Sequence, residues 1–481
     1  MPDFVLQLGV GGVVAALVYD AVFVIWVLLR PRRLQSSSLA WILVILLLPF
    51  VGGIAFLLFG QVWADRHRAR RHRDIVARVR SHDTDHLPTV PHDYLPEDGE
   101  GLATLAYRGG EMPVRPGNQV EVFSETDEVI QRLIDDIRAA RDHCHLLFYI
   151  YLDDDSGRGV AEALLDAEKR GVDCRLLVDS VGSRAFLNSR LARRLEKGGV
   201  QVQEALRTRF KVFSRGRFDI RNHRKIAVID GAVGWTGSQN IADAMFAPKP
   251  EFAPWVDCML RIDGPMVHDL QALFVQDWYM ESAEPLEHVL EMEPRTWEDG
   301  VAAQLMPSGV NSAKDSLVQV LQAGIHVARE EIVLTTPYFV PDEGTLAALV
   351  TAAARGVTTR LVVPKRNDSP LVAAASRSYY EVLLDAGAEI YEYTEGLLHA
   401  KTVTVDSRGA LVGSANLDRR SFEINFELSV LLFNRTLAAR IRALQQSYIE
   451  QSEPVELLEF RRRPMTHRVW ENACGILGPL L

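Results

Sequence analysis

The hydrophobic residues of this chain are concentrated at its N-terminal end. Residues 4–29 are almost continuously apolar, broken by Gln7 and Asp20, and residues 39–59 contain no charged side chain. About 20 consecutive apolar residues cross the hydrocarbon core of a bilayer. The two stretches therefore predict a transmembrane hairpin over residues 1–60. A buried helical hairpin in a soluble fold is the alternative.

Basic residues set the expected orientation of this hairpin. Arg30, Arg32 and Arg33 stand between the two stretches, and five arginines follow within residues 66–73. Arg and Lys are enriched on the cytoplasmic side of membrane proteins. The larger cluster therefore predicts that the rest of the chain lies in the cytoplasm. Residues 61–115, basic at first and then rich in proline, are predicted to be a linker.

Beyond the linker, the pattern of apolar and polar positions describes one α/β unit used twice. Ser124-x-x-Asp127 has the spacing of a helix capping box, and buried strands are expected at 146–151 and 175–179. The same order of elements recurs about 185 residues later, beginning at Ser312. Repetition over this length indicates a duplicated domain rather than a solenoid.

The duplication fixes the expected domain organisation. We predict an α/β fold whose two homologous halves, 116–295 and 296–455, each contain a mostly parallel sheet and together form one bilobal catalytic domain. A tail, 456–481, follows. Its apolar residues at helical spacing suggest a segment at the membrane interface: Val469, Ala473, Ile476 and Leu480, beside Trp470.

Each half also carries the same spaced set of chemically useful residues, H-x-K-x4-D-x6-G-S-x-N. The first half has His223, Lys225, Asp230, Gly237, Ser238 and Asn240, and the second has His399, Lys401, Asp406, Gly413, Ser414 and Asn416. A single His-x-Lys is more often part of an ordinary surface strand. Its recurrence in the same register favours a functional site.

The spacing predicts a shared pocket. Residues i and i+2 of a strand lie on one face, so each histidine is expected to project together with its lysine. Two such edges would supply two imidazoles, two ammonium groups, two hydroxyls and two amides. This set suits a phosphodiester, because cations and amides stabilise the growing negative charge while one histidine attacks phosphorus and the other protonates the leaving oxygen. The lysines and the lack of clustered carboxylates argue against a metal, and no cofactor is expected.

Two further acids are candidates to orient the imidazoles. Asp257 lies 34 residues after His223, and Glu427 lies 28 residues after His399. A carboxylate on the second ring nitrogen would fix the tautomer and raise the basicity of the histidine. Ordinary surface acids are the alternative.

Charge and cysteine content limit the function classes. A formal net charge of −10 argues against a general nucleic-acid binder, and four cysteines without a CxxC spacing make neither a disulfide framework nor a zinc site. Residues 207–225 are nevertheless strongly basic, with interleaved phenylalanines. Arg215, Arg217 and Arg221 are candidates for an anionic lipid headgroup, although such a stretch could also bind single-stranded nucleic acid or be a solvated loop.

The paired motif resembles that of the phospholipase D superfamily, over residues 116–435. With the predicted anchor and the stretches 336–342 and 416–421, the whole chain resembles the bacterial cardiolipin synthases. The resemblance implies a multi-pass protein of the bacterial inner membrane. It implies transfer of a phosphatidyl group between two phosphatidylglycerol molecules through a phosphohistidine, with release of glycerol and without a metal. His223 and His399 would be the nucleophile and the acid/base pair.

In the same pattern Lys225, Lys401, Asn240 and Asn416 assist the histidines, and Asp230 and Asp406 complete the motif. Asp257 and Glu427 fall where the superfamily keeps its histidine-supporting acids. Two other functions stay open. One is a phospholipase D or phosphatidyltransferase that uses water or another alcohol, and the other is a membrane-tethered nuclease.

Overall fold

The computed structural model describes residues 10–29, 35–59, 66–81, 95, 99–207, 219–312 and 315–476. The chain forms two compact units. The N-terminal unit comprises Met1–Arg66 with Phe210–Asp219, and the main unit comprises His67–Arg209 with Ile220–Leu481. All four cysteines are buried and free.

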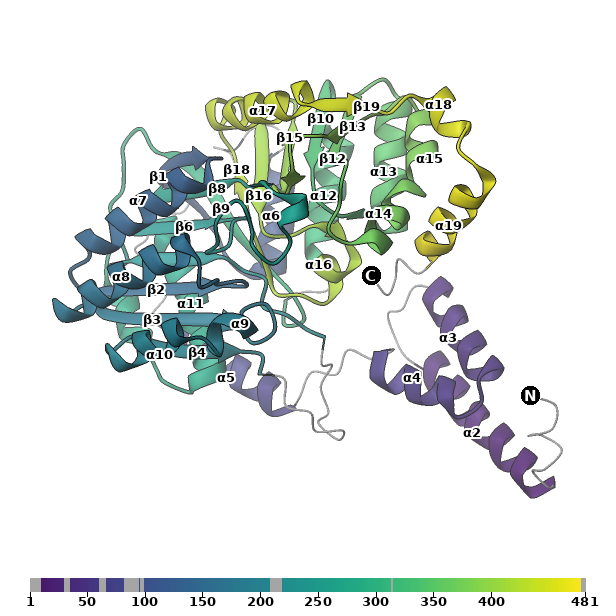
Figure 1. Ribbon diagram of the computed structural model, residues 1–481, viewed down its shortest axis with the longest axis horizontal. Helices are drawn as coiled ribbons and strands as arrows, with labels where there is room; N and C mark the ends of the chain where they lie inside the picture. Colours follow the sequence, from purple (N-terminus) through teal and green to yellow (C-terminus); the bar gives the residue numbers. More distant parts are fainter. Residues whose placement is uncertain are drawn as a thin grey trace. The chain divides into compact units, whose positions relative to one another are not determined.

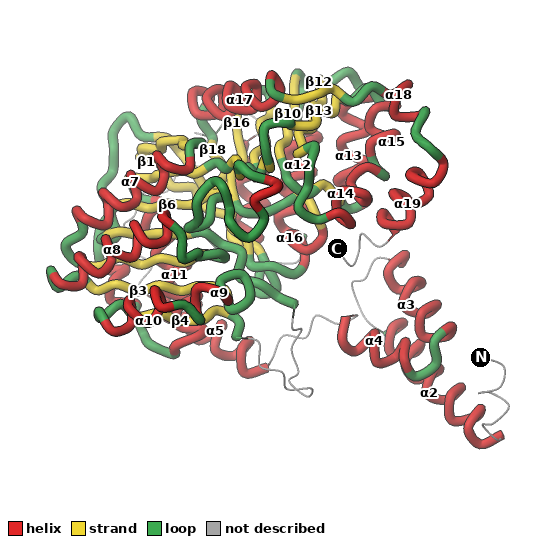
Figure 2. The backbone as a smooth tube through the Cα atoms, viewed as in Figure 1, coloured by secondary structure: helices red, strands yellow, loops and turns green. Residues whose placement is uncertain are grey.

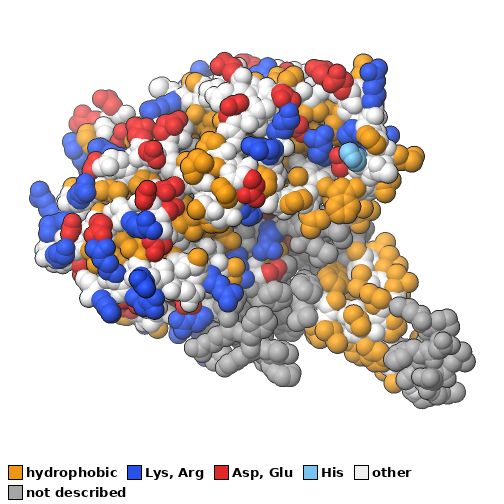
Figure 3. Space-filling model, viewed as in Figure 1, with side chains coloured by type: hydrophobic (Ala, Val, Ile, Leu, Met, Phe, Trp, Pro, Cys, Tyr) orange, Lys and Arg blue, Asp and Glu red, His pale blue; other side chains and the backbone are white. Residues whose placement is uncertain are grey.

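The described part of the N-terminal unit is helical: α2 (Val10–Leu28), α3 (Gln35–Leu47) and α4 (Val51–Phe59). Phe23, Val27, Ile45 and Phe56 form its small core, and many other large apolar side chains on these helices are exposed. In Figure 3 the drawn surface of these helices is almost entirely hydrophobic, whereas the main unit displays mixed charges. No helix among the described residues combines the length and the apolar character that crossing a membrane requires.

The predicted second span, 39–59, is not one helix. Helix α3 ends at Leu47, and α4 begins at Val51. Pro49 has no N–H to donate to the preceding turn, and Phe50 adopts a left-handed conformation with φ 65°. The chain folds back so tightly that a Cβ on Gly52 would lie 2.4 Å from the Val44 carbonyl oxygen. The first predicted span, 4–29, begins outside the described residues.

The main unit contains one 15-stranded sheet that runs through both halves, in the order β19-β13-β12-β10-β15-β16-β18-β9-β1-β8-β6-β5-β2-β3-β4 (Figures 1 and 2). The first half supplies β1 (Val114–Phe123), β2 (His143–Phe148), β3 (Asp173–Asp179), β4 (Gln201–Ala205), β5 (Ile226–Ile229), β6 (Val233–Gly237) and β8 (Met259–Asp263). The second supplies β9 (Val301–Ser308), β10 (Glu331–Thr335), β12 (Thr358–Pro364), β13 (Glu389–Tyr393), β15 (Thr402–Val405), β16 (Gly409–Gly413), β18 (Glu427–Leu432) and β19 (Ser452–Pro454).

The strand order repeats the duplication and corrects one expectation. Reading outward from the β1–β9 junction, each first-half strand has a second-half counterpart in the same position. Only β2–β3–β4 and β10–β12–β13 are parallel, and the other neighbours are antiparallel. The prediction of a separate, mostly parallel sheet in each half is therefore wrong. Short hairpins join β5 to β6 and β15 to β16, and only antiparallel strands can be joined so closely.

Helices cover both faces of this sheet. In the first half, α7 (Thr126–Ala139), α8 (Asp155–Lys169), α9 (Arg184–Leu187) and α10 (Arg190–Lys197) enclose one core, and α11 (Met266–Ser282) packs on the opposite face. In the second half the first set comprises α12 (Ser316–Val327), α13 (Glu343–Ala354), α15 (Tyr380–Asp385) and α18 (Leu457–Arg461), with α17 (Arg435–Glu450) opposite. Helix α14 (Pro370–Arg377) packs on β11 (Phe339–Val340) in a separate small core. Helices α11 and α17 contribute to a core shared by both halves. Helix α19 (Met465–Ile476) packs on α14.

Two local expectations do not hold. The capping boxes are not formed, because Glu125 is the N-cap of α7 and the Ser312 hydroxyl donates instead to the Pro307 carbonyl. The region 61–115 is not simply a linker, because it contains α5 (Arg66–Ser81) and α6 (Gly99–Gly110). Helix α5 buries Ile75 and Val79 in the shared core, since apolar residues recur on one face of an otherwise basic helix.

The motif aspartates are turn residues rather than site residues. Asp230 and Asp406 both adopt left-handed conformations, each with φ 51°. The Asp230 carboxylate accepts three backbone N–H bonds, from residues 141, 142 and 143, at 2.8–2.9 Å. The Asp406 carboxylate accepts the equivalent three, from residues 329, 330 and 331. Asp230 thus ties the β5–β6 hairpin to the start of β2, and Asp406 ties the β15–β16 hairpin to the start of β10.

Because three charge-assisted bonds depend on one carboxylate, Asp230→Ala should lower the free energy of unfolding by about 2–4 kcal/mol. Urea denaturation of the purified full chain, followed by tryptophan fluorescence, measures the change. Asp155→Ala, which removes an exposed carboxylate at the start of α8, is the matched control, with an expected loss below about 1 kcal/mol. Equal stability of Asp230→Ala and the wild type would contradict the structural role.

Candidate active site

The two histidines lie where the halves exchange backbone hydrogen bonds. His223 and His399 stand three residues before β5 and β15, and both are buried. The N–H of His223 donates to the Phe426 carbonyl at 2.8 Å, and the N–H of His399 donates to the Val256 carbonyl at 2.7 Å. Beside His399, the short strand β14 (Leu397–Leu398) pairs with β7 (Trp255–Val256). Each histidine is therefore held by the half to which it does not belong.

The carboxylates follow the same crossed arrangement. His223 Nδ1 lies 2.8 Å from Glu427 Oε2, and His399 Nδ1 lies 2.6 Å from Asp257 Oδ1. In the sequence each acid follows the histidine of its own half. In the structure each acid contacts the histidine of the other half. A carboxylate at Nδ1 favours the tautomer that carries its proton there. Nε2 is then left as the nitrogen that can act on a ligand.

The two motif serines support the acids. Ser238 Oγ donates to Asp257 Oδ1 at 2.6 Å, and Ser414 Oγ donates to Glu427 Oε2 at 2.5 Å. The same hydroxyls accept the backbone N–H groups of Cys258 and Leu428. The sequence predicts that these hydroxyls line the pocket. In the structure they donate their hydrogen bonds to the two carboxylates.

Both lysines are fully buried beside the histidines. Lys225 Nζ donates to the His223 carbonyl at 2.8 Å, and Lys401 Nζ donates to the His399 carbonyl at 2.5 Å. An aromatic ring contacts each imidazole: Tyr149 lies 4.8 Å from His223 and Trp255 lies 4.7 Å from His399, between ring centroids. These walls keep water away from the ammonium groups, which strengthens their effect on a bound anion.

Burial and charge set the ionisation of these groups. Desolvation lowers the pKa of His223 to about 4, with Lys225 acting in the same direction and Glu427 opposing it. The pKa of His399 is lowered for the same reasons, by burial and by Lys401. Burial also lowers the pKa of Lys225 to about 8. Burial also lowers the pKa of Lys401, well below its usual value. Both imidazoles are therefore mainly neutral near pH 7.

The supporting acids remain ionised despite their burial. Burial alone would raise the pKa of Asp257, but contact with His399 and Ser238 holds it at about 2. The pKa of Glu427 is lowered in the same way, since His223, Lys225 and Ser414 outweigh the desolvation. Each histidine thus faces a fixed negative charge on one nitrogen.

The remaining residues predicted for the site lie in different surroundings. The Asn240 amide oxygen accepts the Ile150 N–H at 3.0 Å, which leaves its NH2 group for the pocket. The amide oxygen of Asn416 is buried and has no partner within the described residues. Asp230 and Asp406, which complete the motif, lie at the far ends of β5 and β15 from the histidines, where their carboxylates accept backbone N–H groups. Among the headgroup candidates, Arg221 is half-buried, and Arg215 and Arg217 lie outside the described residues.

One functional contact was not predicted from the sequence. Asp277, on α11, accepts from Arg224 Nη1 at 2.7 and 2.8 Å and from Asn222 Nδ2 at 3.2 Å. Arg224 and Asn222 flank His223, so α11 holds the histidine loop from both sides. The sequence contains a sign of this contact. His223 is flanked by polar residues, whereas His399 is flanked by the apolar Leu398 and Ala400.

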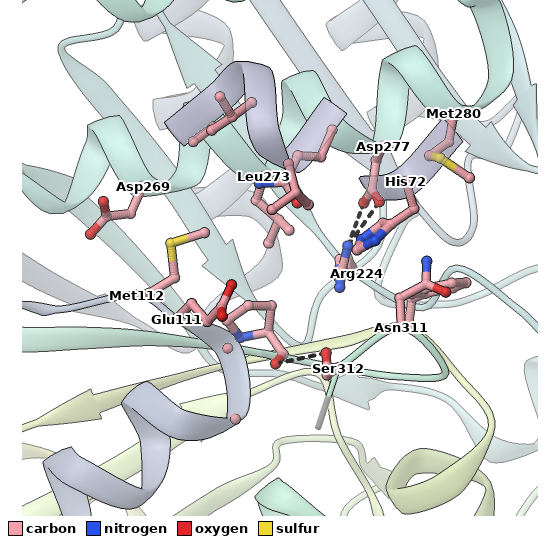
Figure 4. A pocket seen from close by; sticks show the side chains of 18 of the residues that line it. His72, Glu111, Met112, Arg224, Asp269, Leu273, Asp277, Met280, Asn311 and Ser312 are labelled. Carbon is pink, nitrogen blue, oxygen red and sulfur yellow. Dashed lines mark hydrogen bonds and ion pairs between the residues drawn. The ribbon is translucent and has the colours of Figure 1, made fainter. Parts of the chain in front are cut away.

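Asp277 borders a cavity of about 260 Å³ between α5, α6, α11 and residues 307–312. In Figure 4, Arg224 and Asp277 face each other with His72 of α5 beside them. Helix α5 also reaches α11 through Arg68, which pairs with Glu281, and Arg71, which donates to the Met280 carbonyl. The basic helix is therefore attached to the element that holds His223.

Two joined α/β halves that exchange histidine-supporting acids define the phospholipase D fold class. A family model described as "Cardiolipin synthase, PLD-like domain" matches residues 133–278 and 321–448, and one described as "Phospholipase_D-nuclease N-terminal" matches residues 21–61. The crystal structure of a phosphatidylserine synthase from Haemophilus influenzae is similar in fold, with a TM-score of 0.58 and 16% sequence identity. The alignment covers 76% of this chain and 95% of the chain of that synthase. At this identity the likeness concerns the fold.

Similar curated proteins identify the family within this fold class. Cardiolipin synthase A of Serratia proteamaculans is 36% identical over 462 residues, which cover 94% of this chain and 95% of the relative. Cardiolipin synthase A of Yersinia pseudotuberculosis is also 36% identical, with the same coverage. The chain therefore belongs to the cardiolipin synthase family.

The lowered pKa of His223 can be measured without a substrate. Diethyl pyrocarbonate modifies neutral imidazole. The folded protein is modified at a series of pH values and digested, and the modification of the peptide that contains His223 is followed by mass spectrometry. The rate of modification should have a pH midpoint near 4. N-acetylhistidine amide is the reference, with an expected midpoint of about 6.5. A midpoint for His223 at or above the reference would show that burial and Lys225 do not dominate its ionisation.

Proposed function

We propose that this protein is a membrane-anchored phosphatidyltransferase that makes cardiolipin and glycerol from two molecules of phosphatidylglycerol. One observation carries the proposal: two neutral histidines have Nδ1 fixed on a carboxylate of the other half, and Nε2 has no hydrogen-bond partner among the described residues. A nucleophile and an acid/base are what a two-step phosphoryl transfer requires. The near full-length likeness to curated cardiolipin synthases supports the choice of substrate.

In the first step, His223 Nε2 attacks the phosphorus of one phosphatidylglycerol. The bond between phosphorus and the ester oxygen of the headgroup glycerol breaks. His399 donates a proton to that oxygen, and glycerol leaves. In the second step, His399 takes the proton from a hydroxyl of the second phosphatidylglycerol. That oxygen attacks the phosphohistidine, the P–N bond breaks, and cardiolipin is released. We assign the attack to His223 by resemblance to the family.

The lysines and the bound phosphodiester adjust the proton supply. In the free site burial, with Lys401 acting in the same direction, lowers the pKa of His399, which disfavours the protonated form that the first step requires. An anionic phosphodiester beside Lys225 and Lys401 compensates their charge and so raises the pKa of both imidazoles. The substrate thereby favours the uptake of the proton that its leaving group needs. Asn240 and Asn416 supply amide groups to the non-bridging oxygens.

The membrane anchor is also part of the proposal. The exposed apolar side chains of α2–α4 support insertion of the N-terminal unit, with the main unit on the cytoplasmic side of the cell membrane, because such surface is costly in water. Helix α19 exposes Met465, Val469, Trp470 and Ile476, which supports contact of the tail with the interface. We retain 1–60, 116–295, 296–455 and 456–481 as the functional divisions, with α5 and α6 attached to the catalytic halves.

The direct test is purified full-length protein with labelled phosphatidylglycerol in vesicles. We expect cardiolipin and glycerol in equal amounts. Phosphatidic acid without cardiolipin would instead identify water as the acceptor, and cleavage of DNA with no lipid product would identify a nuclease. His223→Ala and His399→Ala should each reduce transfer by at least about 10³-fold, as loss of a nucleophile or its partner does elsewhere. Substantial activity in either variant would refute the two-histidine mechanism.

The crossed carboxylates make a sharper prediction. Glu427→Gln keeps the shape of the side chain but removes the charge that fixes His223, so kcat should fall by about 10²-fold or more with little change in KM. Initial rates of cardiolipin formation measure the effect. Glu423→Gln, an exposed change four residues earlier, is the matched control and should retain wild-type kinetics. Near-normal kcat in Glu427→Gln would contradict the role of the acid.

A further inference from the structure

The duplication allows each half to serve as a reference for the other. Arg170 donates to the carbonyls of Ile137 and Ala140 at the end of α7, and Arg355 donates to those of Ile325 and Ala328 at the end of α12. Ile137 therefore corresponds to Ile325. By the same register Asp136, one residue earlier, corresponds to Gly324.

The sheet gives two further corresponding positions. Trp235 on β6 pairs with Ala227 and Arg261, while Leu411 on β16 pairs with Val403 and Leu431. Both Trp235 and Leu411 lie two residues before the glycine of the GSxN motif. Arg261 and Leu431 thus occupy equivalent places on β8 and β18.

In the first half these three positions fill the space under the helix. Trp235 is fully buried and donates from Nε1 to Asp136 at 2.9 Å. Arg261 makes two bonds to the same carboxylate, at 2.8 and 2.9 Å. The Trp235–Asp136–Arg261 network therefore occupies this space with mutually bonded side chains.

In the second half the same three positions border an apolar cavity. Gly324, Leu411 and Leu431 replace the network, and they line a cavity of about 280 Å³ between α6, α12 and the strands β15, β16 and β18. A Cβ on Gly324 would meet only Val405 Cγ2, at 3.9 Å, so the wall there is open. A cavity of about 150 Å³ lined by such residues already accepts a benzene ring. This one is large enough for a longer apolar group.

Charge at the cavity edge limits what the occupant is. The charged lining residues are Asp406, Arg408 and Arg435. The Asp406 carboxylate is occupied by three backbone N–H groups. Arg408 lies 3.8 Å from Glu330, and Arg435, at the start of α17, is exposed with no carboxylate partner in the described part of the chain. The edge therefore favours an anion beside an apolar chain.

We propose that this cavity, which we call the α12 cavity, binds one acyl chain of an anionic membrane phospholipid, with its headgroup at Arg408 and Arg435. The site lies at the opposite end of β15 from His399. It is thus a second lipid site, and it goes beyond the proposed reaction because its occupancy does not require transfer at the histidines.

The test uses lysophosphatidylglycerol with a diazirine in its single acyl chain, added to the full-length protein in phosphatidylcholine nanodiscs. After irradiation, peptide mass spectrometry should find cross-links on α12 and on β15–β16. Leu411→Trp and Gly324→Leu fill the cavity from opposite walls, and each should reduce this labelling at least fivefold. Leu458→Trp, at a side chain 70% exposed on α18, adds a tryptophan elsewhere and should leave the labelling unchanged.

Two comparisons make the proposal falsifiable. The filled variants should melt no lower than the wild type, because both occupy empty space, so a loss of labelling reports the cavity and not misfolding. Arg408→Gln with Arg435→Gln should lower labelling by the lysophosphatidylglycerol probe towards that of the matched lysophosphatidylcholine probe. Absence of cross-links in the wild type, equal labelling of the filled variants, or equal labelling by both probes would overturn the proposal. None of these readouts depends on cardiolipin formation.

Discussion

The site depends on the contact between each imidazole and a carboxylate from the opposite half. Glu427 fixes His223 and Asp257 fixes His399, so neither half possesses a complete catalytic group. The serines, the lysines and the backbone bonds at residues 223 and 399 all serve this exchange. Each serine orients an acid, and each lysine sets the charge around an imidazole. The two halves are therefore one catalytic unit in the chemical sense as well as in the fold.

The continuous sheet explains why the exchange can be held so closely. Strands β1 and β9 pair directly, so the two halves share a ladder of hydrogen bonds rather than a flexible connection. Helices α11 and α17 pack across the shared core on the same face. Separation of the halves would break both. Asp277 extends this support from α11 to the residues on either side of His223.

Much of this arrangement could be predicted from the sequence, because the motif spacing is local and appears twice. The histidines, the lysines and the two supporting acids were all named from residue types and intervals. The crossing of Asp257 and Glu427 could not be derived, since it depends on which strands lie side by side across the β1–β9 junction. The true role of Asp230 was hidden for a related reason: its three partners are backbone groups, which leave no mark in a sequence pattern.

The elements whose conformation differs from the local sequence pattern share a different cause. Pro49 and Phe50 interrupt a stretch that hydropathy alone treats as uniform, and hydropathy does not report a left-handed residue. The composition of α5 predicts a linker because arginines dominate it, but Ile75 and Val79 recur on one face and are buried. Ser124 and Ser312 had the spacing of a cap, but the helices begin one or more residues later. In each case tertiary contacts decided between two locally acceptable conformations.

Fusion of the two halves into one chain has a consequence for how the histidines can differ. Two identical subunits around a symmetry axis would have to give both imidazoles the same acid and the same neighbours. Here one imidazole has a glutamate, a tyrosine ring and polar neighbours tied to Asp277, while the other has an aspartate, a tryptophan ring and apolar neighbours. A single polypeptide can therefore specialise its two histidines by independent substitutions, a division of labour that exact symmetry forbids.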